Sequence, residues 1–453
     1  MSNITELATR PVGSLLWKYS LPSVVGMTVV SAYNVIDRIF IGQKVGPDAI
    51  AGLAITFPVM NLSTAFGVLV GAGASARVSM LLGAGRTDEA QRVLGNALVL
   101  TLVIGTLYVA GFGLFLEDIL RAFGASERTL PPAYAFLSTI LPGLLMMNLT
   151  FSFNNIQRSS GYPRRAMSAM LISAGINVVL AALFIFVFEW GIRGAACATL
   201  IASGCAFIFV FAHFFRKTST VHFRRGIYRP RWSVIWPIMA IGAAPFVVNV
   251  AGCLVNVIIN TSLVRYGGDD AVGAAGIFTT VTQLVVMIVI GICQGMQPIV
   301  GYNYGAGKTG RSLRAFWLAA GASTVLCAVA AVFGLLLPEA VARAFTSFPT
   351  LIEVTRVCLT TTLVAFPVVG FQIVSTTFFQ SIGKAGKSFM LGLARQVIFL
   401  IPLLLILPRL YRLQGIWMAF PLSDTCATIV TAVMVWWQIR NMRGHKDVKK
   451  GEC

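Results

Sequence analysis

Long apolar runs separated by short polar stretches recur along almost the whole chain. Most of these runs exceed the roughly 20 residues that an α-helix needs to cross the hydrocarbon core of a membrane. The strands of a membrane barrel are much shorter and alternate in polarity, so the pattern predicts an all-α integral membrane protein instead. Twelve transmembrane helices are expected, over residues 14–42, 50–80, 91–116, 131–157, 166–188, 194–215, 234–264, 271–302, 315–337, 352–379, 387–408 and 415–439.

The second half of the sequence repeats the first at a constant offset, which places position 34 on position 256. The triplet NVI at 34–36 thus falls on NVI at 256–258, and GAG at 83–85 falls on GAG at 305–307. Since each half has six spans, both halves enter the membrane from the same side and the repeat is parallel. Two pseudo-symmetric six-helix lobes suit alternating access, although duplication also produces passive scaffolds and channels. The expected domains are an N-lobe at 1–217, a basic cytoplasmic linker at 218–232, a C-lobe at 233–440 and a cytoplasmic tail at 441–453.

Composition and charge restrict the class of protein further. Apolar residues make up 57% of the chain and charged residues 11%, which excludes a soluble enzyme and a disordered protein. The net charge is +19, and Lys and Arg collect in the loops on one side of the predicted membrane. This bias predicts that both termini are cytoplasmic. The basic, aromatic linker TSTVHFRRGIYRPRW is interpreted as contacting anionic membrane lipid, and no nucleic acid partner is expected.

Two carboxylates fall inside predicted spans, where an ionised group costs about 2.5–3.5 kcal/mol. Asp37 lies in the first span and Asp424 in the last. Burial favours the neutral form of such an acid, so it can take up a proton near neutral pH. Tyr33 and Asn34 share the helix face of Asp37, because they precede it by one turn. For Asp37 a coupling site is favoured over a plain ion pair at the membrane edge, and for Asp424 both interpretations stay open.

Uncharged amides also interrupt the apolar runs. Together with aromatic residues and methionines they suit a cavity for amphiphilic organic substrates. Hydrogen bonds between helices explain them equally well, so both interpretations stay open. The candidates for a substrate cavity are Tyr33, Asn34, Asn154, Gln157, Asn256, Gln283, Gln294, Gln380 and Asp424.

Motifs for other chemistry do not stand out. The GAGKTGR loop lacks the spacing of a Walker motif, so the energy for transport is expected from an ion gradient or a partner subunit. No nucleophile motif, HExxH motif or close pair of carboxylates suggests an enzyme. The eight cysteines form no CxxC pair and the three histidines lack ligand spacing, so neither a metal nor a cofactor is expected.

Several motifs resemble those of the multidrug and toxic compound extrusion (MATE) family, in particular its MepA-like branch. The motifs are NVIDRIFIG at 34–42, SARVSMLLGAGRTDEA at 75–90, NNIQRSSGYPRRAM at 154–167, GICQGMQPIVGYNYGAGK at 291–308, FFQSIGKAGKS at 378–388 and LQGIWMAFPLSD at 413–424. The resemblance implies two six-helix lobes and ion-coupled antiport of cationic or amphiphilic compounds.

The resemblance also implies an ion site in the N-lobe. Related members place an acid on the first helix, an Asn and an Asp four residues apart on the fifth, and a Thr on the sixth. Asp37, Asn177 and Thr199 match three of these positions, but the helix-five Asp is replaced by Ala181. One carboxylate instead of two disfavours a tight Na⁺ cage, which favours H⁺ over Na⁺ as the coupling ion.

The hypothesis from the sequence is a multidrug efflux antiporter of the bacterial cytoplasmic (inner) membrane, of the kind that contributes to antibiotic resistance. It would export cationic or amphiphilic compounds, as a monomer, in exchange for H⁺. A lipid-linked oligosaccharide flippase of the same superfamily is the alternative, although its cavity should be more cationic. A membrane-embedded enzyme is a weaker rival, because no catalytic cluster is evident.

Overall fold

The structure is a computed structural model that describes residues 4–45 and 47–450, and these residues form helices joined by short turns, without a strand. Ten helices are long and apolar enough to cross a membrane. Two of them are of double length, because each contains a residue with non-helical backbone angles, Gly268 or Arg412, at which one crossing gives way to the next. The ten helices therefore supply the twelve crossings that the apolar pattern predicts.

The N-lobe contains the first six crossings. A short helix α1 (Thr5–Thr9) precedes them, and another, α5 (Leu116–Ala122), follows the third. The crossings are α2 (Val12–Lys44), α3 (Pro47–Gly83), α4 (Thr87–Leu114), α6 (Leu130–Ser159), α7 (Pro163–Ala182) with the π-helix η1 (Leu183–Val187), and α8 (Gly191–Phe214).

The C-lobe begins with the double-length α9 and includes the short α11 (Pro338–Arg343). Its elements are α9 (Trp232–Gly305), α10 (Thr309–Leu336), α12 (Pro349–Thr362), η2 (Leu363–Ala365), α13 (Phe366–Ser381), α14 (Ala385–Leu393), η3 (Ala394–Leu400) and α15 (Ile401–Lys450). The turn inside α9 is at Gly268, whose φ of 65° lies in the left-handed region that glycine tolerates best.

The internal repeat is visible in the helix bounds. Under the offset of the sequence repeat, the two ends of α4 fall on the two ends of α10, and the first position of α5 falls on the first position of α11. The turns repeat as well, since Gly85 and Gly307 have φ angles of 75° and 71°, and Gly161 and Gly383 have 101° and 73°. A left-handed residue after a helix satisfies its last carbonyl groups, so the same stop signals end corresponding helices in both lobes.

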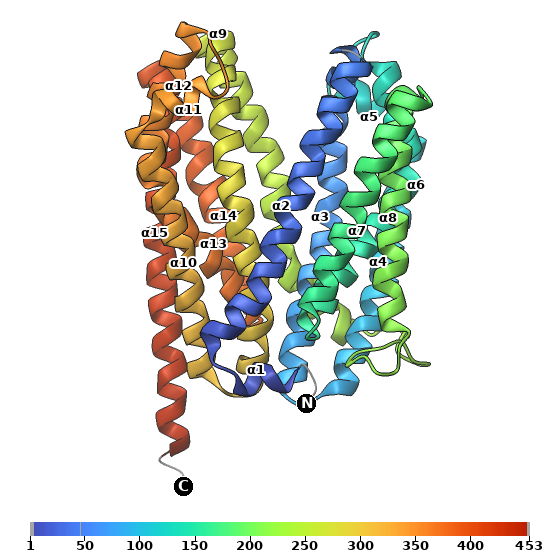
Figure 1. Cartoon of the computed structure of the whole chain (residues 1–453). Helices are drawn as coiled ribbons and strands as arrows, with labels where there is room; N and C mark the ends of the chain where they lie inside the picture. Colours follow the sequence, from blue (N-terminus) through green and yellow to red (C-terminus); the bar gives the residue numbers. More distant parts are fainter. Residues whose placement is uncertain (1–3, 46, 451–453) are drawn as a thin grey trace.

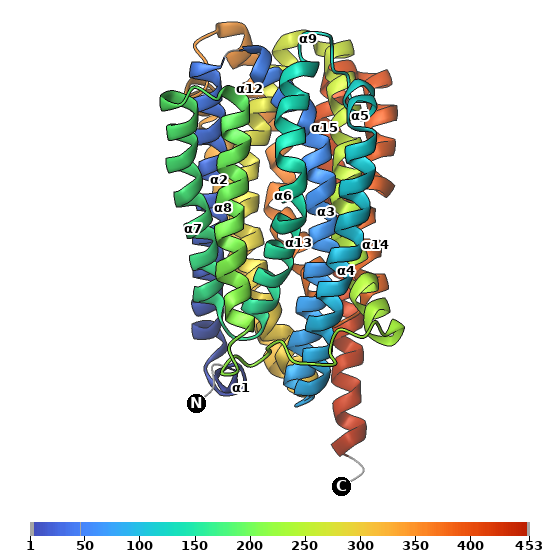
Figure 2. The ribbon, with the colours of Figure 1, turned by 90° about the vertical axis from the view of Figure 1, so that its right-hand side faces the viewer.

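Both termini lie at one end of the molecule, here called the terminal end (Figures 1 and 2). The helix α2 runs diagonally away from this end, between the two halves of the bundle (Figure 1). Its first part packs in the core of the C-lobe, where Leu15 and Tyr19 are buried beside Phe316. Its last part packs in an N-lobe core, where Ile41 is buried. One helix thus belongs to both lobes.

The two lobes meet along α3 and α9, where glycines allow backbone to touch backbone. A Cβ atom at Gly83 would lie 1.9 Å from the Tyr302 carbonyl oxygen, and one at Gly305 would lie 2.0 Å from the Met80 carbonyl oxygen. The offset of the repeat places Gly83 on Gly305 and Met80 on Tyr302, so it converts one contact into the other. No side chain fits such a gap, so the glycines are required for this close approach of the lobes.

The segment between α8 and α9 lies against the terminal end of the N-lobe (Figure 2). Asn96 Nδ2 donates to the Ile227 carbonyl oxygen at 3.2 Å, and Arg224 pairs with Asp88 at 2.8 Å. These contacts fix part of the basic linker on the protein, while its interaction with lipid stays a prediction.

Candidate ion and substrate site

Asp37, Asn177 and Thr199 come together from α2, α7 and α8 of the N-lobe. Asn177 lies between the other two and is 1% exposed. With its Nδ2 turned toward α2, it donates to both carboxylate oxygens of Asp37 at 3.0 and 3.1 Å, and its Oδ1 accepts from Thr199 Oγ1 at 3.0 Å. With the amide turned the other way, Nδ2 donates to Thr199 Oγ1 at 3.0 Å and Oδ1 faces the carboxyl group.

The two orientations of the amide suit two protonation states of Asp37. An ionised carboxylate only accepts hydrogen bonds, so it requires Nδ2 of Asn177, whereas a protonated carboxyl can donate to Oδ1. Thr199 can follow either state, because its hydroxyl also lies 3.0 Å from the Ala195 carbonyl oxygen. The cluster can therefore satisfy its hydrogen bonds with or without a proton on Asp37.

No cation neutralises Asp37, since none of the ion pairs among the described residues includes it. Lys44, two turns further along α2, pairs with Glu189 at 2.8 Å instead. This ammonium group lowers the pKa of Glu189 below its usual range by hydrogen bonding and by charge. Ala181, where related members carry an acid, is fully buried in an N-lobe apolar core. The site thus holds one carboxylate among neutral polar groups.

The predicted cavity residues fall into groups of different exposure. Asn34, Asn256 and Gln283 are exposed, while Tyr33 and Gln294 are partly buried. Gln294 bridges the lobes, because its Nε2 lies 3.8 Å from Met27 Sδ.

Asn154 and Gln157 are buried at the terminal end of α6. Asn154 donates to the Ala166 carbonyl oxygen at 2.8 Å and accepts from Arg158 at 3.0 Å, which ties α6 to α7. Both polar atoms of the Gln157 side chain are buried without a partner. Gln380 is likewise buried, at the end of α13. These positions are separate from the Asp37 cluster, and their contact with substrate stays a prediction.

Asp424 forms an ion pair, which was one of its two open interpretations, with a partner that the sequence did not indicate. Its Oδ1 accepts from Arg395 Nε at 2.8 Å, and the Asp424 side chain is 11% exposed. Arg395 lies on η3, in the crossing before that of Asp424. An arginine and an aspartate in consecutive apolar spans were the only signal available, and they do not reveal whether the two side chains face one another.

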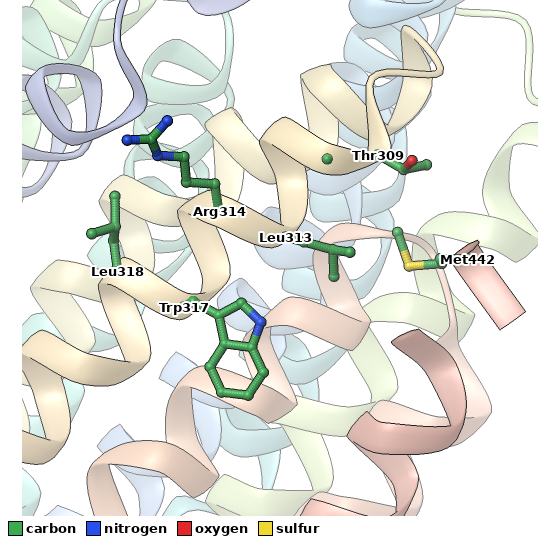
Figure 3. Close-up of a pocket in the computed structure, with 7 residues that line it drawn as sticks. Thr309, Leu313, Arg314, Trp317, Leu318 and Met442 are labelled. Carbon is green, nitrogen blue, oxygen red and sulfur yellow. The ribbon is translucent and has the colours of Figure 1, made fainter. Parts of the chain in front are cut away.

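A cavity of about 530 Å³ lies at the terminal end of α10, where Arg314, Trp317 and Met442 contribute to its wall (Figure 3). A neighbouring cavity of about 550 Å³ shares Gly310 and Arg314 with it. None of the predicted site residues lines either cavity, so the candidate ion site is separate from both.

Comparisons with known proteins agree with this architecture. A family model described as MatE matches residues 22–183 and 242–406, one stretch in each lobe. The chain is 26% identical over 435 residues to the multidrug export protein MepA of Staphylococcus aureus (strain NCTC 8325 / PS 47), covering 95% of both chains. It is also 26% identical over 424 residues to the multidrug export protein MepA of Staphylococcus haemolyticus (strain JCSC1435), covering 93% of both.

Among solved structures, the chain resembles one described as the outward-facing conformation of a multidrug resistance MATE family transporter of the MOP superfamily. The TM-score is 0.91 and the identity 22%, over 98% of this chain and 99% of the other. A second, MATE in complex with MaL6, has a TM-score of 0.92 and 22% identity, over 98% of this chain and 100% of the other. At these identities the likeness establishes the fold.

Proposed function

Because the chain belongs to the MatE family, a family of transporters and not of enzymes, we propose that it exports cationic and amphiphilic organic compounds in exchange for protons. The observation that carries the proposal is Asp37, a carboxylate inside the membrane whose polar partners are neutral. Carboxylates inside membrane-spanning segments normally serve a transported ion or substrate, since hydrocarbon makes them costly. The names of the MepA relatives support the export of multiple drugs.

The proposed coupling step is the protonation of Asp37. While the acid is ionised, Asn177 directs its Nδ2 to the carboxylate and Oδ1 toward Thr199. A proton on Asp37 makes the acid a donor, so the amide turns and Nδ2 binds Thr199 instead. The proton thus changes the hydrogen bonds between α2, α7 and α8, and a difference of this kind can bias two arrangements of the lobes.

Alternating access is supported by the two-lobe repeat and by the way the lobes touch. The contacts at Gly83 and Gly305 join α3 to α9 through bare backbone. Among the described residues, side-chain hydrogen bonds also join α3 to α9, from Gln297 Nε2 to Ser75 Oγ at 3.2 Å and from Asn61 Nδ2 to Cys253 Sγ at 2.9 Å. Separation of the lobes would break these isolated bonds. Substrate would leave on the side opposite the termini, and the proton would be released on the side of the termini.

The proposal also covers the membrane in which the protein lies, its oligomeric state and its coupling ion. The distribution of Lys and Arg supports the bacterial cytoplasmic (inner) membrane with both termini inside, and the chain would work as a monomer surrounded by lipid. Sodium is the alternative coupling ion, but replacement of the second acid by buried Ala181 leaves few oxygen ligands for it. The alternative cargo is a lipid-linked oligosaccharide, in which case the protein would be a flippase.

The test is ethidium transport in proteoliposomes under an imposed pH gradient or an imposed Na⁺ gradient. We expect transport with the pH gradient, none with Na⁺ alone, and loss of proton-driven transport in Asp37→Asn. Asp118→Asn, an exposed acid on α5, is the matched control and should transport like the wild type. Undiminished proton-driven transport by folded Asp37→Asn would refute the coupling role, and transport driven equally by Na⁺ would refute the choice of ion.

A further inference from the structure

Arg395 places a positive charge inside the C-lobe, and its guanidinium is only partly engaged. Its Nε donates to Asp424, but among the described residues no partner is found for its two Nη groups. The Arg395 side chain is 34% exposed, against 11% for Asp424. One edge of the guanidinium is therefore neutralised, and the other edge carries free N–H donors.

The pair is held in place from three elements, α13, η3 and α15. Gln372 Nε2 donates to the Asp424 carbonyl oxygen at 2.5 Å and to Thr428 Oγ1 at 2.6 Å. Ser423 Oγ donates to the Arg395 carbonyl oxygen at 2.8 Å. These bonds fix the backbone at both ends of the ion pair, so the guanidinium keeps one orientation.

The free edge of Arg395 is not expected to face lipid. Its partner Asp424 and the neighbouring Gln372 are both buried between helices. Unpaired N–H groups facing hydrocarbon would be costly, and charged side chains in membranes accordingly face a cavity or a partner. The exposed part of the Arg395 side chain is therefore expected to face water or a ligand, and not lipid.

The repeat relates this pair to the ion site of the N-lobe. At the offset that places position 34 on position 256, Asn177 corresponds to Phe399, and Arg395 lies about one helical turn before it. The N-lobe thus offers a carboxylate without a cation, and the C-lobe offers a guanidinium edge without an anion, at related depths. The two lobes thus carry opposite charges at related positions of the repeat.

We propose that Arg395 recognises a carboxylate on the transported molecule, so that the cargo includes amphiphiles that carry a carboxylate beside a cationic aromatic system. The planar guanidinium matches a carboxylate in two parallel hydrogen bonds, which a lysine ammonium cannot reproduce. Asp424 is a positioning residue here, since it holds Nε and leaves the outer edge free. The inference rests on the proposed export function and adds a determinant of its specificity.

The experiment compares two dyes that differ only at one group, rhodamine 110 with a free carboxylate and rhodamine 123, its methyl ester. Proton-driven transport of both is measured in proteoliposomes for the wild type, Arg395→Gln, Arg395→Lys and Asp424→Asn. We expect the wild type to transport both dyes. Arg395→Gln should lower the ratio of kcat/KM for the acid to kcat/KM for the ester at least tenfold. The ratio for Arg395→Lys should lie between those of the wild type and Arg395→Gln. The ratio for Asp424→Asn should be closer to that of the wild type than the ratio for Arg395→Gln is.

Each other outcome overturns the inference. A wild type that transports the ester but not the acid has no carboxylate recognition. An unchanged ratio in Arg395→Gln means that Arg395 does not read the carboxylate. Equal loss of both dyes in a variant that elutes as a folded monomer means a structural role for Arg395. Failure of the proposed function looks different, because then the wild type transports neither dye, or Asp37→Asn transports rhodamine 123 undiminished.

Discussion

At the scale of single residues, Asn177 is the group that would sense the charge of Asp37 in the proposed coupling step. It is the only one of the three site residues that touches both others, and it is nearly fully buried. Its amide has a donor and an acceptor at equal distance from the chain, so it can answer a change of protonation by turning. Thr199 has a second partner in the Ala195 carbonyl oxygen and can lose its bond to Asn177 without being left unpaired.

The contributions of these residues to coupling should therefore differ. Asn177→Ala removes both hydrogen bonds to the carboxylate, and a bond to a charged group contributes about 1.5–3 kcal/mol, so we expect a loss of proton-driven efflux of roughly tenfold or more. Thr199→Ala leaves the bonds to Asp37 intact and should cost about threefold or less. Initial rates of ethidium transport at a fixed pH gradient check the order. A Thr199→Ala variant as defective as Asn177→Ala would contradict it.

At the scale of helices, the contact between α9 and α3 depends on glycine. A Cβ atom at Gly242 would lie 1.7 Å from the Leu69 carbonyl oxygen, so backbone has to move to admit it. Overpacking of a tight contact costs about 1–3 kcal/mol, and Gly242→Ala should lower the midpoint of thermal unfolding in detergent. The control is Gly276→Ala on the same helix, where nothing lies within 4 Å of the added atom. Equal midpoints for the two variants would show that the lobes do not need this contact.

The short helix α1 fastens the start of the chain to the C-lobe. Leu7 is fully buried in the C-lobe core, and its carbonyl oxygen accepts from Asn303 Nδ2 at 3.0 Å and from Arg311 at 3.2 Å. Glu6 forms an ion pair with Lys18 of α2. The hydrogen bond from Lys18 holds the pKa of Glu6 below its usual value of 4.5. The anchor thus joins α1 and α2 to the adjacent ends of α9 and α10.

This ion pair predicts a dependence of stability on pH. A carboxyl whose pKa is lowered in the folded state stabilises it above the unfolded value near 4.5, and that stability is lost as the pH falls through the lowered pKa. Glu6→Gln should therefore unfold at a lower temperature than the wild type at pH 7, and the difference should shrink as the pH falls below 4.5 and through the lowered pKa of Glu6. Thermal unfolding from pH 7 to pH 3 measures it. A difference that grows in acid would contradict the assignment.

At the scale of helices, part of the fold could be predicted from the sequence and part could not. The crossings follow from apolar runs, because a membrane leaves the backbone no alternative to a helix. The tightness of two connections between crossings did not follow, because the polar residues around Gly268 and Arg412 resemble a loop while a single residue with non-helical backbone angles suffices to turn the chain. The partnership of Arg395 with Asp424 was not predictable either, since it depends on the rotation of two helices about their axes.

The Asp37 cluster could be predicted only in part from the residues themselves. Asp37 stands out in the sequence as a charge inside an apolar run, but its partners Asn177 and Thr199 were suggested by resemblance to a family rather than by the residues alone. Polarity also failed to indicate which amides face a common space. Asn154 and Asn256 are alike in the sequence, yet the first is buried against α7 and the second is exposed.

At the scale of the whole molecule, two homologous lobes touch along α3 and α9, where glycines admit close backbone contacts, and share the helix α2. The exchange of the contacts at Gly83 and Gly305 under the repeat shows that the pseudo-twofold axis passes between them. Rotation about such an axis can open one side of the protein while it closes the other. The proposed cycle therefore requires the contacts between α3 and α9 to part in every turnover.

A covalent link between α3 and α9 should stop the cycle. A Cβ atom at Gly301 would lie 2.8 Å from Ser79 Cβ, so cysteines at 79 and 301 in a cysteine-free protein can form a disulfide between the lobes after small adjustments. Oxidation should abolish ethidium transport, and reduction should restore it. The matched control joins two helices of one lobe through Gly71→Cys and Ser152→Cys, where a Cβ atom at Gly71 would lie 3.4 Å from Ser152 Oγ. Because alternating access moves lobes and not helices within a lobe, the control should transport equally in both redox states. Full transport by the oxidised link between lobes would mean that substrate crosses without the lobes parting, and a rocking mechanism could not stand.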